Sequence, residues 1–209
     1  MEILFATANR DKAVELGSLL SSLGVEIRTL LDFPAAEQIE ETGETLQENA
    51  LLKAYAGFHL SGLPTIADDT GLEVGALNGQ PGVYSSRYAG ENATYADNVK
   101  KLLFEMKAVP SDERQARFVT VVAYVDKGLE IVASGEVLGQ ITHRSYGTSG
   151  FGYDPVFRVN ETGMTYAEMG LAEKNKMSHR ARAFNNLLIE LRKHQQHQPQ
   201  FKKWELPID

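Results

Sequence analysis

Two long β-rich segments that follow each other closely constrain the fold of this chain more than any other feature. Residues 117–125 and 129–138 are rich in β-branched and aromatic side chains, and only Asp126-Lys127-Gly128 separates them. A short connection that ends in glycine between two such runs is typical of a β-hairpin. The sequence therefore predicts two long paired strands.

The N-terminal part of the chain alternates between strand and helix patterns. Residues 3–6 are apolar and break at the polar stretch 7–11, which is typical of a buried strand followed by a turn. Leucines then recur at helical spacing through residues 12–23, and Gly24 follows them as a C-cap would. Residues 25–30 suit a second strand.

A second helix and a third strand lead to a pair of acids. Thr45 and Glu48 form a capping box, in which the hydroxyl and the carboxylate bind free backbone amides, so a helix is expected to begin there. Residues 65–67 read as the next strand. We expect that strand to end at Asp68 and Asp69, which would place two carboxylates at the end of a buried element.

The rest of the chain contains two glycine loops and two more helices. Residues 75–90 and 147–155 read as loops, and helices are expected to begin at Thr94 and at Ser178. The last helix should bury a stripe of Phe and Leu residues. Residues 195–209 turn to Gln, His and Pro, which predicts a loose polar tail that includes Trp204.

Composition limits the classes of function. With 209 residues and 43% hydrophobic content, the chain can bury one substantial core, so we expect a single domain over residues 1–194. It has no cysteine, which excludes disulfides, thiolate metal sites and thiol nucleophiles. A net charge of −7 argues against a nucleic acid polymer as partner. Without a leader or a membrane-length apolar run, we expect a cytoplasmic protein that does not bind membranes.

The polar turn after the first strand is a candidate anion site. Backbone amides and the helix dipole would face a phosphate there, and Lys12 could add a charge. Any α/β protein has such a turn, so the feature is equally typical of structure alone. The P-loop pattern is missing, which argues against a P-loop kinase. The residues of this turn are Thr7, Ala8, Asn9, Arg10, Asp11 and Lys12.

Six acids make up a candidate magnesium site, because carboxylate oxygens are the ligands that this ion takes beside substrate phosphates. On their own, Glu41 and Glu44 are more typical of solvated surface charges. Asp68 and Asp69 are different, since adjacent carboxylates repel each other unless a cation or a proton separates them. The full set is Glu40, Glu41, Glu44, Asp68, Asp69 and Glu73.

An aromatic loop and a basic group near the C-terminus could bind a nucleobase. Aromatic side chains stack on bases, and Asp154 could accept a hydrogen bond from a ring N–H, although loop aromatics more often pack on the core. The basic group could equally be a solvated helix face. The loop comprises Phe151, Gly152, Tyr153, Asp154 and Pro155, and the basic group comprises Lys174, Lys176, His179, Arg180 and Arg182. Neither a G-x-S-x-G elbow nor a dinucleotide fingerprint is present.

Six segments, in this order, resemble the family of inosine triphosphate pyrophosphatases, also called Ham1-like or non-standard purine NTP pyrophosphatases. One such segment alone would carry little weight, but six in register make the resemblance specific. It extends from residue 1 to about His194, and the tail departs from the family pattern. The segments are residues 6–12, residues 40–43 with 48–50 and Lys53, residues 67–72, residues 81–88, residues 151–155, and residues 173–174 with 178–180.

The resemblance implies a mixed α/β fold with an elongated, twisted central sheet, flanking helices and two lobes around a substrate cleft, assembled as a homodimer. It also implies a magnesium-dependent hydrolase that converts non-standard purine nucleoside triphosphates (ITP, dITP, XTP) to the monophosphate and pyrophosphate, which cleanses the nucleotide pool. Glu40 and Asp69 would hold Mg²⁺. Asp69 would also accept a proton from the water that attacks the α-phosphorus, with Asp68 as a second acid.

The same resemblance assigns the substrate contacts. Residues 7–12 and Lys53 would hold the triphosphate, and Thr70 would touch the substrate. The base and sugar pocket would consist of Phe151, Gly152, Tyr153, Asp154, Lys174, His179 and Arg180. Deamination replaces the donor amine at C6 of adenine by an acceptor oxygen, so donors in this pocket would be left unpaired against adenine.

Two other interpretations stay open at this point. One is a related Maf-like pyrophosphatase that acts on pyrimidine or modified nucleotides, and the segment 178–180 with the aromatic loop favours the first family over it. The other is a nucleotide sensor without catalytic activity that uses the same residues. Replacing Asp69 by Asn would separate sensor from enzyme.

Overall fold

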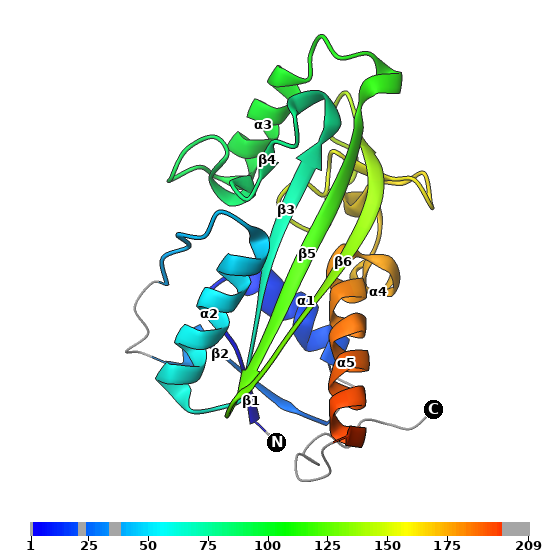
Figure 1. The fold of residues 1–209 in the computed structure, drawn as a ribbon. Coiled ribbons are helices and arrows are strands. Elements are labelled where there is room, and N and C mark those ends of the chain that lie inside the picture. The colour runs from blue at the N-terminus through cyan, green and yellow to red at the C-terminus, as the bar shows by residue number, and fades with distance from the viewer. Residues whose placement is uncertain (1, 21–23, 34–38, 198–209) are drawn as a thin grey trace. The chain divides into compact units, whose positions relative to one another are not determined.

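The structure is a computed structural model that describes residues 2–20, 24–33 and 39–197 (Figure 1). The chain divides into two compact units. Unit 1 takes its described residues from Met1–Asp69, Val121–Gly135 and Ala181–Asp209, and unit 2 consists of Thr70–Thr120 and Glu136–Arg180. No helix within the described ranges has the length and apolar character needed to cross a membrane.

The strands form one mixed sheet, and helices separate several of them along the chain. The strand order is β2-β1-β3-β5-β6-β7, with β4 paired to β3. Strand β1 is parallel to β2 and β3, whereas β4 is antiparallel to β3 and β7 is antiparallel to β6. The predicted mixed α/β class is thus confirmed. The elements are β1 (Glu2–Phe5), α1 (Arg10–Leu20), β2 (Glu26–Thr29), α2 (Leu46–Ser61), β3 (Thr65–Val74), β4 (Pro81–Gly82), α3 (Tyr95–Glu105), β5 (Gln115–Asp126), β6 (Leu129–Ile141), β7 (Phe157–Val159), α4 (Leu171–Met177) and α5 (His179–His197).

The predicted hairpin forms β5 and β6, the longest strands of the sheet that Figure 1 shows. Lys127 and Gly128 connect them with φ angles of 32° and 89°. Two successive residues with positive φ make the tight turn that matches the twist of paired strands. Both strands extend beyond the ends that the sequence predicts.

In unit 1, the helices cover the two faces of the sheet. Ile66 of β3 packs in one cluster with Leu16 of α1 and Leu187 of α5. The next residue, Ala67, packs in another cluster with Ala54 of α2. Because successive side chains of a strand point to opposite faces, α1 and α5 lie on one face and α2 lies on the other.

Helix α2 begins where the sequence predicts. Thr45 and Glu48 form the capping box, and Gly62 ends the helix with a φ of 68°. The helix also packs close to the sheet, because a Cβ atom at Gly57 would lie 2.9 Å from the Cβ of Ala6. This close packing brings the buried face of α2 directly against the sheet.

The structure corrects one expectation about β3. This strand does not end at Asp68 and Asp69 but continues to Val74. Both acids are nearly buried, with exposed fractions of 2% and 6%, and Leu72 and Val74 beyond them are fully buried in the core of unit 2. A polar pair therefore interrupts the apolar pattern of a strand without ending the strand.

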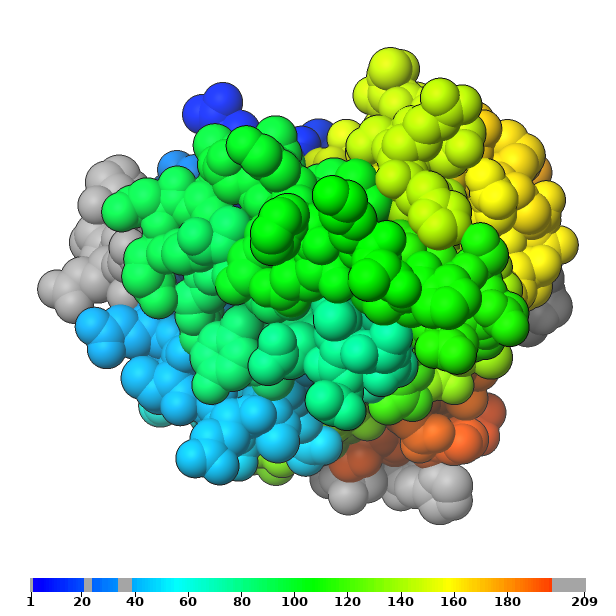
Figure 2. All heavy atoms as spheres, turned by 90° about the horizontal axis from the view of Figure 1, so that it is seen from above, coloured from blue at the N-terminus to red at the C-terminus, as the bar shows by residue number. Residues whose placement is uncertain are grey.

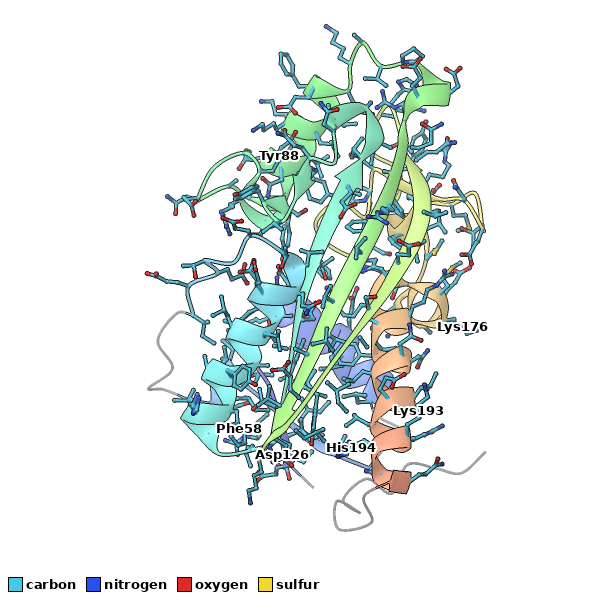
Figure 3. The ribbon with its side chains drawn as sticks, in the orientation of Figure 1. Phe58, Tyr88, Asp126, Lys176, Lys193 and His194 are labelled. Carbon is cyan, nitrogen blue, oxygen red and sulfur yellow. The ribbon has the colours of Figure 1, made fainter. Side chains whose placement is uncertain are left out.

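Unit 2 has its own core, in which Leu102 of α3 packs with Leu72, Phe157 and Tyr166. Helix α3 begins after Thr94, as predicted, where Thr94 and Asp97 form a capping box, and its atoms are among the green ones in Figure 2. Tyr88, labelled in Figure 3, lies with its ring 4.2 Å from the ammonium of Lys101 on α3. The short helix α4 is absent from the sequence prediction.

The last helix carries the predicted apolar stripe, since Phe184, Leu187 and Leu191 are buried in unit 1. It continues to His197, past the predicted start of the tail at residue 195. The remaining part of that tail, residues 198–209, lies outside the described residues.

Candidate functional site

The two acids in the middle of β3 face opposite sides of the sheet. Asp68 follows Ile66 in the alternation and pairs with Lys12 of α1, whose Nζ lies 3.2 Å from each carboxylate oxygen. Asp69 pairs with Lys53 of α2, with 3.1 Å between Nζ and Oδ1. Each of the two neighbouring carboxylates thus has an ammonium group of its own, which offsets the repulsion between them.

Two further residues complete the surroundings of Asp69. Lys53 Nζ also lies 2.6 Å from Oε1 of Glu41. Glu41 is thus paired, and it is half-buried, whereas the sequence around it is typical of a solvated charge. Asn49, fully buried on α2, donates from Nδ2 to Asp69 Oδ2 at 3.3 Å and accepts from the Gly43 N–H at 2.8 Å. A polar pair four residues apart on the buried face of a helix, Asn49 and Lys53, is the sequence signal that could have found this cluster.

The ionisation of this cluster follows from burial and from its charges. Burial raises the pKa of Asp69 above its ordinary value, and the attraction of Lys53 and Lys12 offsets only part of that effect. Burial alone would lower the pKa of Lys53, but the charges of Asp69, Glu41 and Asp68 raise it above its ordinary value. Lys53 is therefore a firmly charged ammonium beside a carboxylate that holds its proton more tightly than usual.

The turn before α1 forms as predicted, but Asn9 occupies two of its backbone donors. Its Oδ1 accepts from the N–H groups of Asp11 and Lys12 at 2.9 Å and 3.2 Å, which makes Asn9 the cap of the helix. Thr7 is buried, and its Oγ1 accepts from the Asn9 N–H at 3.1 Å. The side chains of Ala8, Arg10 and Asp11 are exposed. A phosphate would meet a turn that is already ordered.

The donor set of unit 1 fits a magnesium ion that substrate phosphates complete. Glu40 is exposed, and Asp69 offers carboxylate oxygens in the cluster with Lys53. Within residues 2–20, 24–33 and 39–197 there is no group of three or more His, Asp or Glu that could hold a metal ion alone. Magnesium does not require such a group, because it commonly takes only one or two protein carboxylates beside phosphate oxygens.

In unit 2, a buried ion pair organises the aromatic loop. Lys174 Nζ lies 2.5 Å from Asp154 Oδ2, and both side chains are almost fully buried. The same Oδ2 accepts from the Phe151 N–H at 2.9 Å, and the Lys174 ammonium lies 5.0 Å from the centre of the Phe151 ring. A Cβ atom at Gly150 would lie 2.0 Å from this carboxylate, so only glycine fits there. The position of Phe151 is thus fixed from two sides.

The remaining predicted residues of unit 2 divide into buried and exposed ones. His179 and Arg180 are buried at the start of α5, and the Arg180 guanidinium lies 5.8 Å from the Phe151 ring. Tyr153 is buried in the core, where its hydroxyl donates to the carbonyl of Ser85 at 2.9 Å. Lys176 of α4 is exposed, as the solvated-face interpretation has it, whereas Arg182, which lies in unit 1, is half-buried.

Fold and side chains together define a class. This is a mixed α/β protein with a buried lysine–carboxylate cluster in one unit and an aromatic–basic cluster in the other. The sequence pattern of the Ham1 family matches residues 3–190, and the chain belongs to this family.

Curated relatives agree with this assignment. A dITP/XTP pyrophosphatase of Thermoanaerobacter sp. (strain X514) is 49% identical over 188 residues, which cover 90% of this chain and 94% of that protein. A dITP/XTP pyrophosphatase of Shigella flexneri is 47% identical over 194 residues, covering 91% of this chain and 98% of the relative. The similarity thus extends over nearly the whole length of both proteins.

Solved structures share the fold. The Staphylococcus aureus Ham1 protein superimposes with a TM-score of 0.81 at 37% identity and covers 93% of this chain and 100% of its own. The nucleoside-triphosphatase (dITP/XTP pyrophosphatase) of Mycobacterium abscessus superimposes with a TM-score of 0.72 at 42% identity, covering 90% of this chain and 99% of its own. The predicted family and fold are both confirmed.

Proposed function

We propose that this protein hydrolyses non-standard purine nucleoside triphosphates, ITP, dITP and XTP, to the monophosphate and pyrophosphate. The observation that carries the proposal is Asp69, a carboxylate that is 6% exposed, has a raised pKa and is held by Lys53 and Asn49. A carboxylate whose pKa is raised is a stronger base than an ordinary aspartate. The names of the relatives, dITP/XTP pyrophosphatase, give the substrate class.

In the proposed reaction, Asp69 accepts a proton from the water that attacks the α-phosphorus, and pyrophosphate leaves as the bond to the β-phosphate breaks. Lys12 and Lys53 supply positive charge for the triphosphate, and residues 7–12 hold it through their backbone and side chains. Preorganised charges of this kind stabilise the charge that develops in phosphoryl transfer. Asp68, on the opposite face of β3, holds Lys12 in place.

Magnesium is proposed as the cofactor, with Glu40 and Asp69 as its protein ligands. When bound, the ion neutralises charge on the phosphate oxygens. Removing it with EDTA should abolish turnover, and adding Mg²⁺ back should restore it. Activity that is unchanged in EDTA would contradict this part of the proposal.

Base recognition is proposed for unit 2. Phe151 stacks on the purine, Thr70 and Asp154 line the site with Gly152 and Tyr153, and Lys174, His179 and Arg180 provide donors. The buried Asp154–Lys174 pair and the fixed Phe151 backbone support this role, because a binding site gains affinity when its residues are ordered in advance. We further propose a cytoplasmic homodimer with one domain over residues 1–194 and neither nucleic acid nor membrane as partner.

One assay tests the function. The protein is incubated with Mg²⁺ and ITP, XTP, dITP, ATP, GTP or a pyrimidine triphosphate, and both phosphate products are measured. We expect pyrophosphate from ITP, dITP and XTP, with ATP a poor substrate. Release of orthophosphate, or a preference for pyrimidines as in Maf-like enzymes, would overturn the proposal. A nucleotide sensor would bind ITP without turnover.

A further inference from the structure

His179 and Arg180 are joined inside unit 2 through two threonine hydroxyls. Arg180 Nη2 donates to Thr70 Oγ1 at 3.2 Å, and this oxygen lies 2.8 Å from Thr120 Oγ1. Thr120 Oγ1 in turn lies 2.7 Å from His179 Nδ1. Thr120 is fully buried, and His179 and Arg180 are 3% and 2% exposed. The four groups therefore form one hydrogen-bond chain, which is buried at Thr120, His179 and Arg180 and half-buried at Thr70.

The order of the protons in this chain follows from its ends. A guanidinium can only donate, so the oxygen of Thr70 accepts from Arg180. If each hydroxyl accepts on one side and donates on the other, Thr70 donates to Thr120, and Thr120 donates to His179. This order uses every hydroxyl proton within the chain. An imidazole nitrogen that accepts carries no proton, so the neutral ring of His179 has its proton on Nε2.

Packing fixes the plane of the same ring. The imidazole of His179 stacks on the ring of Phe118, with centroids 4.6 Å apart and an angle of 21° between the planes. The ring of Tyr166 meets it from another direction, at 5.9 Å and 60°. The two aromatic rings set where the imidazole lies, and the hydroxyl of Thr120 is the hydrogen-bond partner that lies at its Nδ1.

We propose that Thr120 is a positioning residue for purine selection, which holds His179 as an Nε2–H donor. The inference rests on the proposed function, in which His179 is one of the donors of the base site, and it assigns His179 to the C6 substituent of the purine. An Nε2–H donor matches the C6 oxygen of a deaminated purine, whereas it meets the donor amine of adenine with a second donor. A site built to bind an acceptor rejects a donor in its place because buried polar groups are left unpaired.

Two substitutions of Thr120 test this role. Thr120→Val keeps the shape of the side chain and removes the hydroxyl, and Thr120→Ser keeps the hydroxyl. The readout is the ratio of kcat/KM for ITP to that for ATP. We expect Thr120→Val to lower this ratio at least about tenfold, because a lost donor constraint is worth about 1.4 kcal/mol or more. Thr120→Ser should keep the ratio of the unmodified protein. An unchanged ratio in Thr120→Val, or an equal loss in Thr120→Ser, would overturn the inference.

The tautomer is also measurable without any turnover. Long-range ¹H–¹⁵N NMR spectra distinguish Nε2–H from Nδ1–H imidazoles, and the signals of His179 are those that vanish in His179→Gln. We expect Nε2–H in the unmodified protein, and an Nδ1–H ring there would overturn the inference even if Thr120→Val failed to fold. Absence of ITP hydrolysis by the unmodified protein would instead contradict the proposed function, and the NMR result would still decide the role of Thr120.

Discussion

The two candidate sites of this protein are built from different interactions. In unit 1, Lys12 and Lys53 are held by opposite charges on Asp68, Asp69 and Glu41. In unit 2, Lys174 also pairs with a carboxylate, that of Asp154, but aromatic rings and hydroxyls take the place of further charges. The centres of the Phe151 and Tyr166 rings lie 5.0 Å and 5.2 Å from Lys174 Nζ, and Arg180 donates to a threonine hydroxyl. A charge cluster is suited to moving protons and binding phosphates, whereas a rigid aromatic site is suited to recognising a base. Substitutions in the two units should therefore fail in different ways.

The largest effect is expected at the proposed base. Asp69→Asn should lower kcat by about 10²- to 10⁴-fold, the typical contribution of a general base, while ITP still binds. The matched control is Asp126→Asn, because Asp126 is equally buried, at 6% exposure, in the same unit. Stopped-time assays give kcat, and calorimetry gives binding. Full turnover by Asp69→Asn would show that Asp69 is not the general base and that another group takes the proton.

Loss of Lys53 should affect both binding and pH dependence. Lys53→Ala should raise KM for ITP by roughly 10- to 100-fold, since a hydrogen bond to a charged group contributes about 1.5–3 kcal/mol. Burial raises the pKa of Asp69 and Lys53 lowers it, so removing Lys53 leaves that pKa higher. Because Asp69 must be deprotonated to act as a base, the acid limb of the kcat/KM profile, which reports the ionisation of the free protein, should move to higher pH.

The control for this experiment is Lys100→Ala, which removes an exposed lysine of α3 in unit 2. It should leave KM and the pH profile unchanged. An unchanged KM in Lys53→Ala would show that Lys53 does not bind the phosphates. An acid limb that stays at the same pH would show that the ionisation of Asp69 does not control the rate.

A smaller effect, of a different kind, is expected in the aromatic site. Phe151→Ala should raise KM roughly fivefold, because base stacking contributes about 1 kcal/mol at the low end of its range. The pH profile should stay where it is, since no charge of unit 1 changes. Phe104→Ala, on a side chain that is 76% exposed, is the control. A shifted pH profile in Phe151→Ala would contradict the assignment of proton transfer to unit 1 and base binding to unit 2.

The smallest effect is expected from the C-terminus. Removing residues 198–209, after the end of α5, should leave kcat and KM within about twofold, because the segment lies outside all six motif segments. Size-exclusion chromatography with light scattering should give the same mass class before and after the cut. Inactivation, or a dimer that dissociates, would show that Trp204 takes part in folding or assembly.

Local patterns predicted much of the fold. The capping boxes at Thr45 and Thr94, the turn at Lys127-Gly128 and the stripe of α5 all form as expected. Each of these depends on residues close together in the sequence, so short-range sterics and hydrogen bonds decide it. Helix α4 was not predicted, because a helix of seven mostly polar residues is too short to show an apolar period.

The contacts of the site could not be read in the same way. The sequence suggested a solvated Glu41, because it does not show where the helix that carries its partner Lys53 packs. Asp69 and Asn49 are joined across 20 positions, and Thr120 reaches His179 across 59. Such pairings depend on tertiary packing, whereas the six motif segments identified the family directly from residue order.

The alternation along β3 has a consequence for how this protein can change. Because Asp68 and Asp69 are the same amino acid, position alone distinguishes the one that meets α1 from the one that meets α2. Inserting a single residue before them would exchange their sides and send every later side chain of the strand to the wrong face. A replacement alters one side chain of this strand, whereas an insertion or deletion of one residue moves all the later ones to the opposite face, so this region should tolerate changes of length poorly.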